Sequence, residues 1–170
     1  MALYKVDDFY SDYKDSFSGH DIKNFDVYAD RDDKVGNVKN VLVDEDTGRF
    51  RYFIVDTGFW FLGKQVLLPV GLAQVNYEDK QVVVPGLTKQ QVENLPEFTE
   101  DLRIDNDYEE QVRNIYSPLA PTTGIVGTGY PLLGPGIYDR YPTYYGASGS
   151  FRDYEDQLIA RRREHSRNIR

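Results

Sequence analysis

The chain has 170 residues, enough for one domain of ordinary size with additional segments. It carries 20 Lys and Arg against 28 Asp and Glu, and this net charge of −8 argues against a general nucleic-acid-binding protein. The absence of cysteine excludes disulfides, thiolate metal sites and thiol catalysis. The unusual feature of the composition is its 14 tyrosines beside 9 phenylalanines.

Charge and composition divide the chain into three regions. Residues 1–110 hold 12 basic and 23 acidic residues, whereas residues 111–170 hold 8 basic and 5 acidic residues. Residues 117–150 form a Pro/Gly/Tyr-rich segment with almost no charge. No apolar run is long enough for a secretory signal or a bilayer span, so we expect a cytoplasmic protein.

Residues 1–24 predict an N-terminal helical extension. Val6, Tyr10, Tyr13 and Phe17 recur at helical spacing and form one apolar stripe, with aspartates elsewhere on the helix. We expect this helix to pack on its own domain. Docking on another subunit is the alternative.

Residues 25–98 predict a small β-barrel domain. Segments with strand-like composition recur every 8 to 14 residues, at 37–43, 49–55, 64–70, 73–77 and 82–84. Turn residues separate them, and no gap is long enough for a helix. This spacing predicts a meander that closes into a small barrel or sandwich, and hence a mainly β fold with flanking short helices.

Helices are predicted after the barrel. Thr88 to Gln91 forms a capping box, with Thr at the cap and Gln three residues later. Residues 99–116 are expected to hold a second helix that starts near Asp107, with Tyr108, Val112, Ile115 and Tyr116 on one face.

A basic helix is predicted at residues 151–170. Its apolar stripe consists of Phe151, Tyr154, Leu158 and Ile159, and the run from Arg161 to Arg163 follows. We expect these arginines to be solvated at the helix end, where positive charge is favourable. Docking on the acidic body or on anionic lipid is the less favoured alternative.

Four sequence segments of the predicted barrel domain, in this order, resemble the PRC-barrel family: Phe25–Tyr28, Asp33–Val38, Val43–Tyr52 and Val66–Val70. The resemblance covers about residues 22–87. The family is named for the barrel in the H subunit of photosynthetic reaction centres and includes the C-terminal domain of a ribosome-maturation factor. The resemblance implies a PRC-type barrel that acts by docking onto larger assemblies.

Two further phrases, Val55–Trp60 and Gly86–Phe98, resemble a cyanobacterial and bacterial stress-associated subgroup. Members of that subgroup often carry a second domain after the barrel. Tyr154–Ala160 resembles the opening of that domain, but the sequence ends at Arg170. We therefore expect the second domain to be absent or reduced to a stub. No function of that domain is expected for this chain.

No catalytic constellation is found in the sequence. Loops starting at Asp30, Asp44 and Asp105 all lack the ligand spacing of a calcium-binding helix–loop–helix. His20 and His165 have no metal-ligand spacing. We therefore expect a protein that is not an enzyme and has no cofactor or metal site.

Two aromatic groups are the candidate partner interface: Phe59, Trp60, Phe61 and Leu62, and in the Pro/Gly/Tyr-rich segment Tyr138, Tyr141, Tyr144 and Tyr145. The first group covers the barrel mouth or, alternatively, anchors a partner, since tryptophan is enriched at binding hot spots. The second group packs on an acidic barrel or, alternatively, lies in a disordered spacer. We favour barrel cover for the first and ordered packing for the second.

We predict a non-catalytic protein-binding or assembly module that self-associates, with an unknown protein partner and no nucleic acid. The resemblance allows two alternatives. One is a membrane-peripheral accessory of photosynthetic electron transfer, which would place the protein on photosynthetic membranes through a partner. The other is a docking factor in ribosome or RNA maturation.

Overall fold

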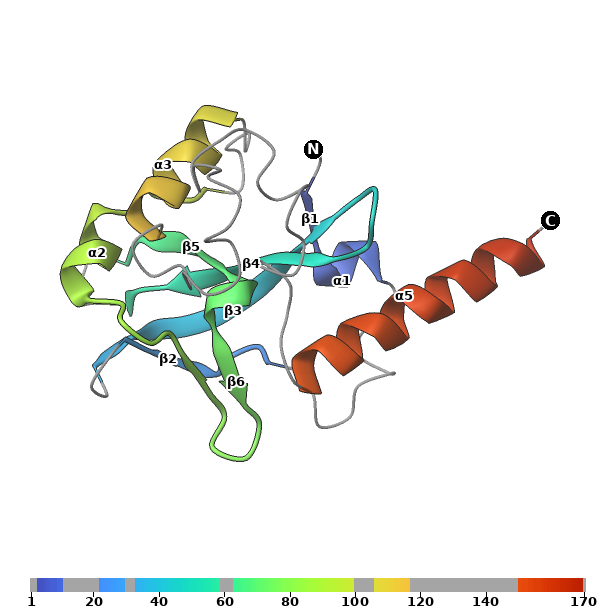
Figure 1. Cartoon of the computed structure of the whole chain (residues 1–170), viewed down its shortest axis with the longest axis horizontal. Coiled ribbons are helices and arrows are strands. Elements are labelled where there is room, and N and C mark those ends of the chain that lie inside the picture. The colour runs from blue at the N-terminus through green and yellow to red at the C-terminus, as the bar shows by residue number, and fades with distance from the viewer. Residues whose placement is uncertain are drawn as a thin grey trace, which may run out of the picture.

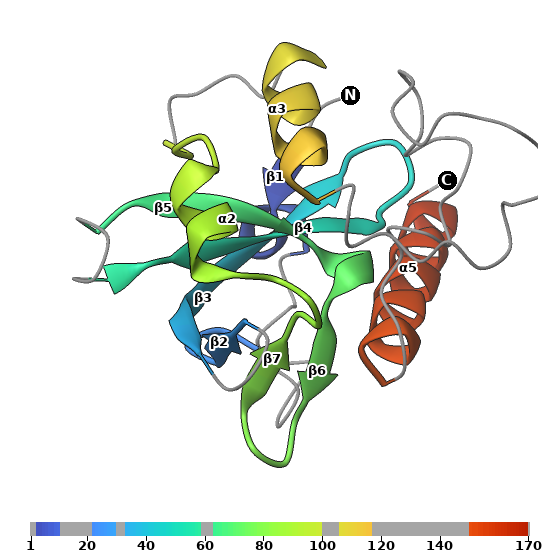
Figure 2. The same cartoon turned by 60° about the vertical axis from the view of Figure 1, so that its left-hand side comes forward.

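The computed structural model describes residues 3–10, 22–29, 33–58, 63–99, 106–116 and 150–169. A mixed β-sheet lies at the centre, with short helices around it (Figure 1 and Figure 2). The strands are β1 (Leu3–Lys5), β2 (Asp26–Tyr28), β3 (Lys34–Asp44), β4 (Phe50–Asp56), β5 (Gln65–Pro69), β6 (Gln74–Asn76) and β7 (Gln81–Val83). The helical elements are α1 (Val6–Phe9), the short 3₁₀ turn η3 (Val70–Leu72), α2 (Lys89–Asn94), α3 (Asn106–Tyr116) and α5 (Ser150–Asn168). This is the mainly β fold with flanking short helices that the sequence predicts.

The strand order of the sheet is β5-β4-β3-β2-β7-β6, with β1 paired on β3. The pair β2 and β7 is parallel, with Val27 opposite Val82, and the other pairs are antiparallel. The prediction of a simple meander is therefore wrong at this pair. Once β2 has paired with β3, its second edge has unpaired backbone groups, and β7 covers that edge.

The sheet must curl, because its two end strands are consecutive in the sequence. A flat sheet of six strands would be about 24 Å wide at the usual strand spacing. Only the short η3 connection separates Pro69 at the end of β5 from Gln74 at the start of β6, and a chain of this length spans at most about 17 Å. The two edges therefore approach each other, as a barrel requires.

The curled sheet is packed on both faces, because neighbouring strand residues such as Tyr52 and Phe53 point to opposite sides. Phe50, Tyr52, Phe53 and Leu67 are among the largest core side chains, and each is almost completely withdrawn from solvent. A cavity of about 10 Å³ lies between Val27 and the side chains around it. A cavity of that size is at the lower limit for one water molecule, so it is too small for an organic ligand.

The predicted N-terminal helix is wrong over its first part. Residues Leu3–Lys5 form β1, which pairs with the end of β3, and α1 stops at Phe9 because Tyr10 is extended. The reason is the length of β3. Its 11 residues extend beyond β2, so β1 pairs with the remaining part of that edge. Val6 and Tyr10 are buried as their stripe predicts, whereas Tyr13 and Phe17 lie outside the described residues.

The helices after the barrel are found where the sequence predicts them. Thr88 caps α2 with both reciprocal bonds of a capping box, to the backbone and side chain of Gln91. On α3, Tyr108 and Val112 are buried, and the Tyr108 hydroxyl donates to the carbonyl of Pro96 at 3.1 Å. The Tyr108 hydrogen bond links α3 to the segment that follows α2.

We predict that Gly36→Ala destabilises the domain. A Cβ at this position of β3 would lie 2.1 Å from the carbonyl oxygen of Asp56, so the β3–β4 pairing would have to shift. The expected loss is about 1–3 kcal/mol of unfolding free energy, measured by urea denaturation. Lys39→Ala, at an exposed position of the same strand, is the control. An equal effect of the two substitutions would contradict the close approach.

Candidate functional site

The interface residues predicted from the sequence lie outside the described residues. They are Phe59, Trp60, Phe61 and Leu62, and Tyr138, Tyr141, Tyr144 and Tyr145. Their roles therefore stay predictions. The described part of the chain brings another set of residues together, at the turn between β3 and β4.

The buried carboxylate of Asp44 stabilises this turn. One carboxylate oxygen accepts from the backbone nitrogens of Asp46, at 2.9 Å, and Thr47, at 3.4 Å. The other accepts from the guanidinium of Arg51 at 2.9 and 3.3 Å. Both side chains are buried, and a buried ion pair is stable only when its hydrogen-bonding groups are satisfied in this way. The pair therefore specifies one geometry for the turn.

A β-bulge places Arg51 for this contact. Leu42 pairs with Tyr52, and the next residue, Val43, pairs with Phe50, so Arg51 is the extra residue of β4. An extra residue in one strand bends that strand and redirects its side chain. The bulge thus gives the Arg51 guanidinium access to Asp44.

Gly48 ties the N-terminal segment to the turn. Its backbone is in the left-handed region, at φ +74°, and its nitrogen donates to the carbonyl of Asp44 at 2.8 Å. The Tyr10 hydroxyl donates to the carbonyl of Gly48 at 2.8 Å. A Cβ on Gly48 would lie 2.6 Å from that hydroxyl oxygen, so both conformation and space favour glycine here.

Glu155 joins α5 to the other side of the turn. Its carboxylate accepts from the guanidinium of Arg49 at 2.7 Å and from the backbone nitrogen of Phe50 at 2.7 Å, and it is only 1% exposed. Arg49 also donates to Asp156, which is exposed, at 2.9 Å. Two hydrogen bonds from the start of β4 therefore fix the position of α5.

Burial decides the ionisation of Glu155. The pKa of its carboxyl is raised, first because burial penalises the charged form, and the hydrogen bonds from Arg49 and Phe50 only partly offset this effect. The pKa of Arg49 is also raised, mainly by its hydrogen bond to Glu155. The contact therefore favours the charged form of both side chains, whereas burial disfavours the charged form of Glu155.

The apolar face of α5 packs beside these bonds. Tyr154, Leu158 and Ile159 are buried, as the predicted stripe requires, and the ring centroids of Tyr154 and Phe50 are 6.3 Å apart. The side chain of Phe151 is not among those described. Ion pairing and apolar packing thus anchor the same half of the helix.

Arg162 corrects the expectation of a wholly solvated arginine run. Its guanidinium lies 4.2 Å from the centre of the Phe9 ring and donates to the carbonyl of Glu45 at 3.3 Å. This residue therefore contacts the body, as the less favoured alternative expects, although its side chain stays exposed like those of Arg161 and Arg163.

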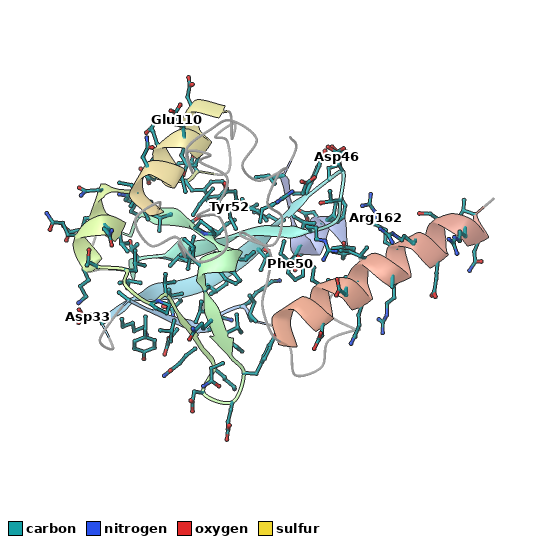
Figure 3. All side chains as sticks on the ribbon, in the orientation of Figure 1. Asp33, Asp46, Phe50, Tyr52, Glu110 and Arg162 are labelled. Carbon is teal, nitrogen blue, oxygen red and sulfur yellow. The ribbon has the colours of Figure 1, made fainter. Side chains whose placement is uncertain are left out.

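A groove of about 630 Å³ lies between α5 and the β3–β4 turn. Arg49, Arg162, Arg163 and Arg167 line it, and we call it the basic groove. Asp46 is the only carboxylate residue among its described lining residues. Figure 3 shows Arg162 on α5 beside the turn that carries Asp46. The groove is therefore lined by positively charged guanidinium groups, although the whole chain has a net charge of −8.

Within the described ranges, no group of three or more His, Cys, Asp or Glu side chains has the arrangement that holds a metal ion. A helix both long and apolar enough to cross a membrane is likewise not found in these ranges.

Sequence reasoning missed the junction between α5 and the turn. Arg49 and Glu155 are 106 residues apart, and no local pattern marks them as partners. The available signal was the charge asymmetry between the acidic residues 1–110 and the basic end. That asymmetry indicated that the two parts could meet, but it identified no contact.

We predict that Glu155→Gln loosens α5 far more than Asp156→Asn, although both carboxylates bind Arg49. The amide of Gln would turn its NH₂ group towards either Arg49 or the nitrogen of Phe50, leaving a buried donor without an acceptor. The expected loss is about 1–3 kcal/mol for Glu155→Gln. It is within about 0.5 kcal/mol for Asp156→Asn, because that carboxylate is exposed. Hydrogen exchange of the α5 amides measures the difference, and equal effects would contradict it.

The pKa of Glu155 also predicts a pH dependence. Because the folded-state pKa lies above the ordinary value of 4.5, protonation favours the folded state. The stability of the native chain relative to Glu155→Gln should be greatest below about pH 4, and should fall as the pH rises through the folded-state pKa. Urea denaturation of both chains between pH 4 and 8 checks this. A difference that grows with pH would contradict the direction of the shift.

Comparison with known proteins agrees with this fold. The family described as the PRC-barrel domain matches residues 14–91, which include β2 to β7. A protein of Deinococcus radiodurans described as uncharacterized is 46% identical over 75 residues, which are 44% of this chain and 27% of that protein. The chain thus spans about a quarter of the length of that relative. The stress-associated subgroup stays a prediction. Residues 14–91 of this chain are a PRC-barrel domain.

Proposed function

We propose that this chain is a non-catalytic protein-binding or assembly module built on its PRC barrel, and that it self-associates. The observation that carries the proposal is the division of α5 into two halves. Its buried residues end at Ile159, whereas all residues from Ala160 to Ile169 are exposed. Figure 1 shows this C-terminal half extending away from the sheet.

A helix with such an exposed half is suited to contact another molecule. The nine residues from Ala160 to Asn168 are too few to form a stable helix alone, but here the anchored half nucleates them. A helix that is polar on all sides commonly bridges between domains. A partner would meet a surface whose backbone is already ordered, which lowers the entropic cost of binding.

The barrel supports the same proposal. Buried side chains of the described residues pack its interior, and the cavity beside Val27 is too small for an organic ligand, which favours binding at the outer surface. The family resemblance also favours docking onto larger assemblies. The two alternatives, accessory roles at photosynthetic membranes or in ribosome maturation, rest on that resemblance alone, and no contact among the described residues favours either one.

The proposed self-association predicts a mass above that of one chain. Sedimentation equilibrium of the intact protein over a range of concentrations measures this mass. If the Phe59–Leu62 run is the contact, Trp60→Ala shifts the equilibrium towards monomer by at least about tenfold, as for a hot-spot tryptophan. Ile169→Ala removes another apolar side chain, one that is 78% exposed, and should leave the equilibrium unchanged.

Two outcomes would contradict parts of this proposal. A native chain that is monomeric at every concentration would show that self-association is wrong. An oligomer that Trp60→Ala leaves intact would show that the aromatic run covers the barrel mouth instead.

A further inference from the structure

We propose that the basic groove binds an acidic peptide segment of a partner protein, with carboxylates at alternate positions. This inference rests on the proposed assembly function and specifies the chemistry of the partner. It begins from the charge of the groove, which is opposite to the net charge of the chain.

Two of the four arginines are already held in place. Arg49 is bonded to Glu155 and Asp156, and Arg162 lies against Phe9 and the Glu45 carbonyl, as described above. Arg163 and Arg167 have no hydrogen-bond or ion-pair partner within the described part of the chain. Their guanidinium groups are therefore the ones available to an incoming anion.

The spacing of these two arginines favours a particular peptide. Arg163 and Arg167 are four residues apart on α5, so their Cβ atoms are separated by about 6 Å. In an extended peptide, alternate side chains lie on one face and repeat about every 6.7 Å. Two carboxylates at alternate positions therefore match two guanidinium groups, each able to bind a carboxylate through two parallel hydrogen bonds.

The size of the groove favours a peptide over a small inorganic anion. Tyr10 and Ile159 line the groove but are buried, so the guanidinium groups are the main contacts that it offers. The groove volume of about 630 Å³ is in the range of sites that hold organic ligands.

A second copy of this chain is one source of such a segment. The net charge of −11 over residues 1–110 makes that part of a second copy attractive to the groove. A different acidic protein would use the same contacts.

The test uses the full chain and a fluorescent eight-residue peptide with Asp or Glu at alternate positions and Tyr or Gly between them. Fluorescence anisotropy measures its binding at low salt. Arg163→Gln and Arg167→Gln should each weaken binding about threefold to fivefold, the range of an exposed ion pair, and the double variant about tenfold or more. Both side chains are exposed, so the fold should be unaffected, and circular dichroism checks this.

Arg161→Gln is the matched control. It removes the same charge from the same helix, but Arg161 does not line the groove, so binding should change by less than about twofold. An equal loss with Arg161→Gln would show non-specific charge attraction and overturn the proposal. Equal binding of a peptide with the same composition but contiguous acids would also overturn it. Displacement of the peptide by an equal concentration of inorganic phosphate would identify a simple phosphate site instead.

Failure of this inference is separable from failure of the proposed function. A native chain that self-associates but does not bind the peptide retains the assembly function and overturns the groove. A monomeric chain that binds the peptide retains the groove and overturns self-association. If Arg163→Gln weakens both self-association and peptide binding, the partner that the groove recognises is a second copy.

Discussion

The buried pair of Asp44 and Arg51 is the interaction on which the attachments to the sheet depend. Asp44 closes the β3–β4 turn with one carboxylate oxygen and neutralises Arg51 with the other. Both groups are withdrawn from water, so loss of either would leave a buried charge. The turn held in this way pairs with β1 beside it, accepts the Tyr10 hydroxyl, and binds α5 through Glu155. Segments from both ends of the chain therefore meet at one hairpin.

This arrangement leaves the outer surface of the barrel as the place where a ligand could bind. The cavity beside Val27 is too small for an organic ligand, whereas the junction between the turn and α5 forms a groove of about 630 Å³. Glu155 anchors one half of α5 and thereby positions the arginines of the other half. Burial disfavours the charged form of Glu155. Its attachment to the turn therefore depends on the hydrogen bonds from Arg49 and Phe50. Anchoring and partner recognition are thus functions of adjacent turns of one helix.

Sequence patterns predicted those elements whose stabilising contacts are local. The capping box at Thr88 links residues three apart, and the stripe through Tyr154 and Leu158 needs only one apolar surface to pack against. The same reasoning failed at Leu3–Lys5, because pairing with the uncovered edge of β3 competes there with helix formation. It also failed for the parallel pairing of β2 with β7, which depends on an edge that exists only after the sheet has assembled.

The sequence by itself determined the PRC-barrel domain, the positions of most strands and helices, and the turn at residues 44–48, because apolar periodicity and turn residues act over a few positions. Only the tertiary structure decided which charges are buried and paired. Arg51 is buried because a bulge turns it towards Asp44, and Arg49 binds Glu155 because α5 returns to the hairpin from 106 residues away. The physical reason is that the energy of a charge depends on the surfaces that remove water from it, and those surfaces are brought together only by the folded chain.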